Sequence, residues 1–118
     1  MYCASFIWEP SSYDSEFHRL NNAIDEIARS LPGYLGVESW QNADGSRKYA
    51  NYYWNDLETL KVFSVHPTHQ EAKRQYSRWY KGYHIVISEV IRLYGDGTVT
   101  ERCRTSHLTT AIAQEPNE

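Results

Sequence analysis

The sequence predicts an α+β fold in which helices cover one face of an antiparallel β-sheet. Segments in which apolar residues alternate along the chain are separated by segments with apolar residues at helical spacing. All the Phe, Trp and Tyr residues lie within residues 1–94, which indicates that the packed core ends there. With 118 residues in total, the chain is long enough for one domain of this kind. We therefore predict a domain over residues 1–94 and a C-terminal extension over residues 95–118.

The spacing of apolar residues changes from that of a strand to that of a helix within the first 31 residues and so indicates the first strand and the first helix. Residues 2–8 alternate between two faces, as in a strand. An apolar stripe at helical spacing then predicts a helix that ends at Pro32-Gly33, and Ser11 or Ser12 is the expected cap. The strand carries Tyr2, Ala4, Phe6 and Trp8 on one face; the helical stripe consists of Phe17, Leu20, Ile24, Ile27, Ala28 and Leu31.

A β-hairpin is predicted next. Residues 36–40 form a short second strand, and residues 47–54 form a third. Between them, Asp44-Gly45 supplies the positive φ angles that a tight hairpin turn needs. The second and third strands are therefore expected to be antiparallel neighbours.

The second half of the chain predicts a broken helix and a last strand. A short helix is expected over residues 56–64, with a cap residue three positions before Glu58. His66-Pro67 interrupts it, and a capping box of Thr68 and Glu71 restarts a helix that Gly82 ends. The last strand, residues 83–94, is apolar on both faces: Tyr83, Ile85, Ile87, Ile91 and Leu93 on one, Val86 and Val90 on the other.

This order of elements, βαββαβ, is that of a ferredoxin-like fold with both helical segments on one face of a four-stranded antiparallel sheet. The other face then lacks a cover within the chain. Because the last strand is apolar on both faces, we expect a second copy to cover it, which gives a homodimer.

Composition excludes several classes of function. With 12 Lys and Arg against 15 Asp and Glu, the formal net charge is −3, which disfavours binding to nucleic acid through bulk charge. No signal sequence or apolar run of membrane-spanning length is present, so a cytoplasmic protein without membrane contact is expected. Cys3 and Cys103 are expected to be reduced thiols. In the extension, residues 98–104 form a candidate fifth strand, followed by a loose tail.

Three runs of sequence together resemble the antibiotic biosynthesis monooxygenase (ABM) family. They are Tyr53 to Glu58, His66 to His69, and Trp79 to Tyr83 with the strand that follows. The resemblance covers about the first 94 residues. It implies a dimeric α+β barrel with a pocket in each subunit between sheet and helices. Characterised relatives include cofactor-free oxygenases of quinols or anthrones and haem-degrading enzymes.

The pattern of site residues separates this chain from some of these relatives. Haem-degrading members carry a Trp and a His where this chain has Phe63 and Lys73, and an Asn on the first strand, which has none here. Many quinol-oxidising members place a His at the position of Phe63. Anthrone-oxidising members use Asn, Trp and Tyr, for which the resemblance offers Asn51, Trp54 and Tyr80. Asn51 and Trp54 are three apart on a strand, so they point to opposite faces.

Cofactor-free oxygenation requires a base, hydrogen-bond donors for the resulting anion and a dry cavity. His69 is the predicted base, since its imidazole is neutral near neutral pH; Tyr80 and Asn51 complete the predicted catalytic set. Trp54, Phe63, Tyr76 and Trp79 are the predicted substrate-binding residues.

Alternative interpretations of these residues remain open. His69 at a helix start is also typical of an exposed residue, and the aromatic side chains are also typical of plain core. His66 and His69 lack a third metal ligand at suitable spacing, so no metal is expected, and no nucleotide-binding motif indicates a cofactor. The basic residues could attract an anionic ligand at the mouth of a pocket, but a solvated face is the expected position; they are Arg47, Lys48, Lys73, Arg74 and Arg78.

Three classes of function are compatible with this sequence. The first is a cofactor-independent monooxygenase of the ABM type acting on a small electron-rich aromatic molecule. The second is a non-catalytic dimeric binding module for haem or another flat aromatic ligand. The third is a dimer whose pocket is filled by its own side chains.

Overall fold

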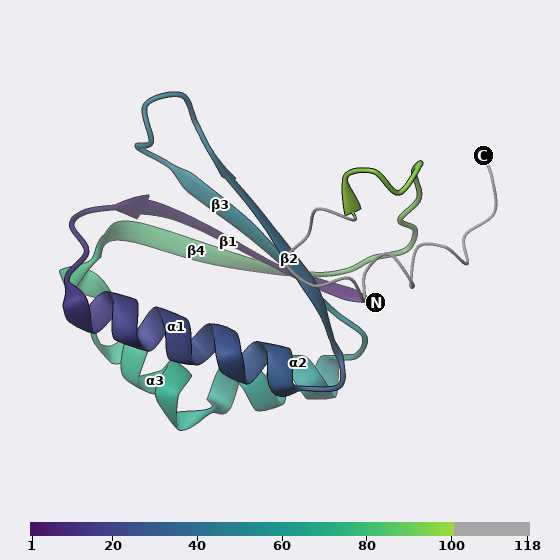
Figure 1. Ribbon diagram of the computed structural model, residues 1–118, viewed down its shortest axis with the longest axis horizontal. Coiled ribbons are helices and arrows are strands. Elements are labelled where there is room, and N and C mark those ends of the chain that lie inside the picture. Colours follow the sequence, from purple (N-terminus) through teal and green to yellow (C-terminus); the bar gives the residue numbers. More distant parts are fainter. Residues whose placement is uncertain (101–118) are drawn as a thin grey trace.

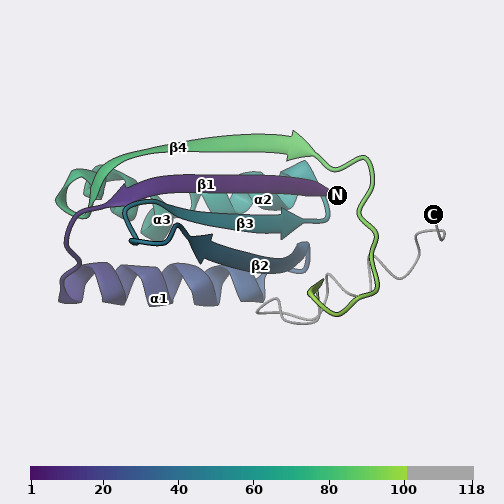
Figure 2. The same cartoon turned by 90° about the horizontal axis from the view of Figure 1, so that it is seen from above.

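Four antiparallel strands form one sheet in the computed structural model, which describes residues 1–100. They are β1 (Tyr2–Pro10), β2 (Tyr34–Gln41), β3 (Lys48–Trp54) and β4 (Tyr80–Glu89). Across the sheet their order is β2-β3-β1-β4 (Figure 2). The two strands that are furthest apart in the sequence, β1 and β4, are therefore neighbours. This order confirms the predicted ferredoxin-like fold.

All the helices lie on one face of this sheet (Figure 1). They are α1 (Ser15–Ser30), α2 (Leu57–Val65) and α3 (Pro67–Arg74). The core lies between the two layers, where burial of apolar surface stabilises the fold. Its buried members are Ala4, Ala28, Tyr34, Val37, Ala50, Trp54, Leu60 and Phe63. No helix of residues 1–100 combines the length and apolarity needed to cross a membrane.

The residues that cap the helices differ from the predicted ones. Asp14, not Ser11 or Ser12, caps α1: its Oδ1 accepts the backbone N–H of Phe17 at 2.9 Å. Asp56 caps α2 by accepting the N–H of Thr59 at 2.7 Å. His66 caps α3, because its Nδ1 accepts the N–H of Thr68 at 3.2 Å. Side chains of these types satisfy the N–H groups that the first turn of a helix leaves without partners.

The helix predicted to end at Gly82 ends earlier. α3 stops at Arg74 and is followed by a 3₁₀ turn, η1 (Tyr76–Arg78). Gly82 instead lies within β4, next to a register shift opposite Glu9 and Pro10 of β1. Proline has no N–H to donate to a sheet ladder and is typical of such irregular positions. The strand therefore begins at Tyr80 rather than at residue 83.

The last strand also ends earlier than predicted, at Glu89 instead of residue 94. Its partner β1 begins at Tyr2, which pairs with Glu89, and the last bond of the ladder joins the N–H of Val90 to the carbonyl of Met1 at 2.9 Å. Within residues 1–100, no strand pairs with the segment that follows. Residues 98–100 of the predicted fifth strand form a turn, and residues 101–104, with Cys103, lie outside the described residues.

Candidate active site

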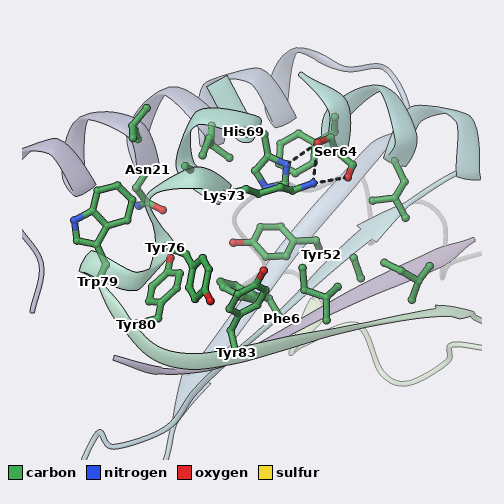
Figure 3. Close-up of a pocket in the computed structure, with 18 of the residues that line it drawn as sticks. Phe6, Asn21, Tyr52, Ser64, His69, Lys73, Tyr76, Trp79, Tyr80 and Tyr83 are labelled. Atoms are coloured by element: carbon green, nitrogen blue, oxygen red, sulfur yellow. Dashed lines mark hydrogen bonds between the residues drawn. The ribbon is translucent and has the colours of Figure 1, made fainter. Parts of the chain in front are cut away.

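A cavity of about 180 Å³ lies between the helical layer and the face of the sheet that it covers. Its volume is similar to that of apolar cavities known to hold a benzene ring, about 150 Å³. Side chains from β1, β3, β4 and all three helices line it, and most of them are aromatic or aliphatic. Figure 3 shows the cavity, with aromatic residues along the sheet and polar residues at the helices. An apolar cavity with a few polar groups is typical of a small-molecule site.

Aromatic rings form the wall on the sheet side. The ring of Phe6 meets those of Tyr80 and Tyr83 edge to face, with centroids 5.6 and 5.7 Å apart. Tyr83, Ile85 and Ile87 of the edge strand β4 line the cavity but are 41%, 47% and 50% exposed. The cavity therefore encloses about one aromatic ring and is open along β4.

The opposite end of the cavity is polar and is built where α2 meets α3. Ser64 lies in the last turn of α2, and His69 and Lys73 lie on α3. Lys73 Nζ donates to the carbonyl of Ser64 at 3.0 Å and to its Oγ at 3.1 Å. Carbonyls in the last turn of a helix have no partner within the helix. The two side chains of α3 supply that partner and are held in place by it (Figure 3).

The tautomer of His69 follows from its contact with Ser64. Its Nδ1 lies 3.3 Å from the Ser64 carbonyl, which can only accept a hydrogen bond. In the neutral ring, Nδ1 therefore carries the proton and Nε2 carries the lone pair. Burial, together with the positive charge of Lys73, lowers the pKa of His69 below its usual value. The imidazole is thus neutral at neutral pH, with Nε2 able to accept a proton.

Tyr80, in contrast to His69, is a hydrogen-bond donor at neutral pH. Burial in the cavity wall raises the pKa of its hydroxyl above the ordinary value for tyrosine. The hydroxyl therefore keeps its proton at neutral pH. Tyr80 can donate a hydrogen bond to a ligand, but it is a poor base.

Six of the seven predicted site residues line this cavity: His69, Tyr80, Trp54, Phe63, Tyr76 and Trp79. Three of them are buried: Trp54, Phe63 and Trp79. Trp54 is 0% exposed and packs against Tyr34 and Phe63, with ring centroids 5.0 and 4.9 Å away. Trp79 is 2% exposed, and its Nε1 donates to Asp14 at 3.0 Å. These two rings support the cavity wall, and little of their surface is open to a ligand.

Asn51 lies on the other face of the sheet. Its Oδ1 accepts a hydrogen bond from Ser5 at 2.7 Å, and Glu38 lies beside it on β2. Glu38 also accepts the hydroxyl proton of Tyr53 at 2.7 Å. This polar cluster is separated from the cavity by the sheet, as the alternation of side chains along β3 requires.

Five lining residues with polar groups were not predicted as site residues: Asn21, Tyr52, Ser64, Lys73 and Tyr83. Alternation along β3 places Tyr52 on the same face as Trp54 and was a usable signal. Lys73 was expected on a solvated face, but its side chain reaches back to α2. That reach depends on the angle between α2 and α3, which no local pattern specifies.

Metal ligands do not gather in the described part of the chain. No group of three or more His, Cys, Asp or Glu side chains comes together within residues 1–100. His66, the partner considered for His69, uses its Nδ1 to cap α3.

Comparison with known proteins defines the class. Residues 4–88 match the monooxygenase af470-like family, and the chain belongs to this family. The uncharacterised protein YqjZ of Bacillus subtilis (strain 168) is 32% identical over 92 residues, which is 77% of this chain and 80% of YqjZ. The family match, residues 4–88, extends from β1 to β4 and so includes all the residues that line the cavity.

Solved structures confirm the expected ABM fold. Rv0793 from Mycobacterium tuberculosis superposes with a TM-score of 0.65 at 13% identity, covering 78% of this chain and 96% of that one. SnoaB, a cofactor-independent oxygenase from Streptomyces nogalater, gives a TM-score of 0.63 at 9% identity, covering 78% and 94%. An antibiotic biosynthesis monooxygenase candidate from Nitrosomonas europaea gives 0.61 at 15%, covering 77% and 99%.

Proposed function

We propose that this protein is a cofactor-independent monooxygenase that oxidises a small electron-rich aromatic molecule, such as a quinol or an anthrone. The observation that carries the proposal is the neutral imidazole of His69, which presents Nε2 in a largely apolar cavity. Its family membership and the likeness of its fold to SnoaB support the same reaction type.

The proposed reaction begins with proton transfer. His69 Nε2 takes a proton from the bound aromatic, which leaves an electron-rich anion in a site with little water. That anion gives one electron to O₂, the resulting radical and superoxide combine to a peroxide anion, and the protonated His69 returns its proton to give a hydroperoxide. The hydroperoxide loses water to leave a carbonyl, so one oxygen atom enters the product and the other leaves as water. Both hydrogens of that water come from the substrate, one of them by way of His69, and no external reductant is consumed.

The size of the cavity bears on the substrate class. A volume of about 180 Å³ encloses about one ring, and further fused rings can extend along the open side at β4. The tetrapyrrole haem is much larger than this space. The cavity therefore favours the aromatic substrate over the haem-binding alternative.

A homodimer through the sheet face opposite the helices is part of the proposal. On that face, Val86 is 48% exposed, and Trp40 is 51% exposed and stacks on Tyr49 at 4.4 Å between centroids. Exposed apolar side chains on one sheet face are typical of a protein interface. A second copy packing sheet to sheet would cover them.

Oxygen uptake tests the reaction directly. An oxygen electrode would follow 1,4-dihydroxynaphthalene and anthrone, each with and without protein, to subtract spontaneous oxidation. His69→Asn keeps a side-chain N–H for the Ser64 carbonyl but removes the base. It should lower the enzymatic rate about 10² to 10⁴-fold. His18→Asn, which alters an exposed histidine outside the cavity, is the matched control.

Two results would count against the proposal. If neither compound is consumed faster with the protein than without it, the protein does not oxidise this substrate class. If His69→Asn is as fast as His18→Asn, His69 is not the base, and a substrate that ionises unaided becomes the better explanation.

A further inference from the structure

The cavity holds one positive charge that the proposed proton transfer does not use. Lys73 is half-buried, and its Nζ lies at the polar end of the cavity beside Ser64 (Figure 3). Of the described residues that line the cavity, none is an Asp or Glu. Within residues 1–100, no carboxylate lies within 4.0 Å of Lys73. An ammonium group held at the wall of the cavity with no carboxylate beside it can form a charge-assisted hydrogen bond to an anionic ligand there.

The hydrogen bonds leave donors available for that anion. An ammonium group has three N–H bonds, and Lys73 directs two of them at the carbonyl and hydroxyl oxygens of Ser64. The third remains for a ligand. Since the Ser64 hydroxyl oxygen accepts from Lys73, its own O–H is also free to donate. Two donors, one of them charged, therefore meet at the wall of the cavity beside the base His69.

We propose that Ser64 and Lys73 form a receptor for an acidic oxygen attached to the aromatic ring of the ligand. This inference rests on the proposed function and narrows it: the substrate class is hydroxylated aromatics that react as phenolates or enolates. Lys73 is the residue that selects them. The ring lies against Phe6 and Tyr80, and its ionised oxygen accepts hydrogen bonds from Lys73 Nζ and Ser64 Oγ. His69 Nε2 accepts the proton of that oxygen, and the negative charge that remains lies beside the Lys73 ammonium.

Charge-assisted hydrogen bonds of this kind give a measurable preference. The test compares 2-hydroxy-1,4-naphthoquinone, which is an anion at neutral pH, with its methyl ether, 2-methoxy-1,4-naphthoquinone. The two probes share a ring system and differ in the charge on one oxygen. Isothermal titration calorimetry on the full chain should find the anion bound at least about tenfold more tightly.

Three variants assign the preference to Lys73. Lys73→Met should reduce it to less than about threefold while the affinity for the methyl ether stays the same. Lys73→Arg, which keeps the charge, should retain most of it. Lys61→Met, on the exposed face of α2, is the matched control and should retain all of it. A melting curve for each variant confirms that it is folded.

Each outcome decides between this inference and its alternatives. If Lys73→Met melts earlier but keeps the preference, Lys73 only caps α2 and the inference is wrong. Equal binding of both probes to the parent protein would overturn it too. If the preference is present and depends on Lys73, but no oxygen is consumed, the receptor stands and the monooxygenase proposal fails. If oxygen is consumed but the preference is absent, the monooxygenase proposal stands and the receptor fails.

Discussion

Trp54 offers a direct test of whether the aromatic residues of the cavity serve packing or ligand binding. Its side chain is 0% exposed and contacts Tyr34 and Phe63 in the core. Replacing a buried Trp by Ala costs about 3–5 kcal/mol of unfolding free energy. Among the described residues, the indole Nε1 of Trp54 has no hydrogen-bond partner, so its removal orphans no other group. We therefore expect the lower end of this range, about 3 kcal/mol.

Urea unfolding measures this loss. With a dependence on urea of about 2 kcal/mol/M, a loss of about 3 kcal/mol lowers the midpoint by about 1.5 M. Leu57→Ala is the control, because Leu57 is 49% exposed at the start of α2 and should lose no more than about 0.5 kcal/mol. All samples need the same protomer concentration, since dimerisation makes stability concentration-dependent. A Trp54→Ala midpoint within about 0.3 M of the parent would refute the packing role.

Three further predictions follow from the site and the sheet. Activity should fall as pH drops through the lowered pKa of His69, because only the neutral ring accepts a proton. At saturating substrate, Lys73→Met should move this acidic limb of the pH profile to higher pH, because the variant removes a positive charge that lowers that pKa; a limb that stays in place contradicts the assignment. Light scattering should find a dimer for the parent protein, a monomer for Val86→Glu and a dimer for the control Val62→Glu. Both side chains are about half exposed, but Val86 lies on β4 and Val62 on α2, on opposite sides of the protein. A monomeric parent would exclude this interface. A chain that ends after residue 104 should have nearly the melting temperature of the parent. A chain that ends after Glu89 should melt at a lower temperature, because Val90 and Leu93 pack against Cys3 and Tyr53. Equal melting temperatures of the two truncated chains would place the domain boundary earlier.

The architecture was predictable because the spacing of apolar residues and the order of the elements determine it. Alternation in β1 and the apolar stripe of α1 are local patterns, and the order of elements permits few topologies. The ends of elements were less predictable, because they depend on partners elsewhere in the chain. β4 stops at Glu89 because β1 begins at Tyr2, although the sequence remains apolar to residue 94.

The site was predictable only in part, for a similar reason. His69 and Tyr80 were found through the resemblance and their chemistry, and the structure brings them to one cavity. Trp54 and Trp79 line the same cavity, but sequence does not say how much of a ring is open to a ligand. Lys73 was expected on a solvated face, because its place in the cavity depends on the turn at His66, which directs α3 back toward Ser64. Whether a lysine at this position lies on the surface or in the cavity depends on how α2 and α3 pack, and not on the type of residue.

The central claim is that the protein inserts one atom of O₂ into an aromatic substrate without a cofactor. Single-turnover incubation of chelator-treated protein with 1,4-dihydroxynaphthalene under oxygen-18 gas, followed by mass spectrometry of the product, tests it most directly. We predict a hydroxynaphthoquinone that carries one labelled oxygen, formed faster than in the protein-free control and slowed by His69→Asn. A product without label, or label incorporated equally fast without protein, would contradict the claim.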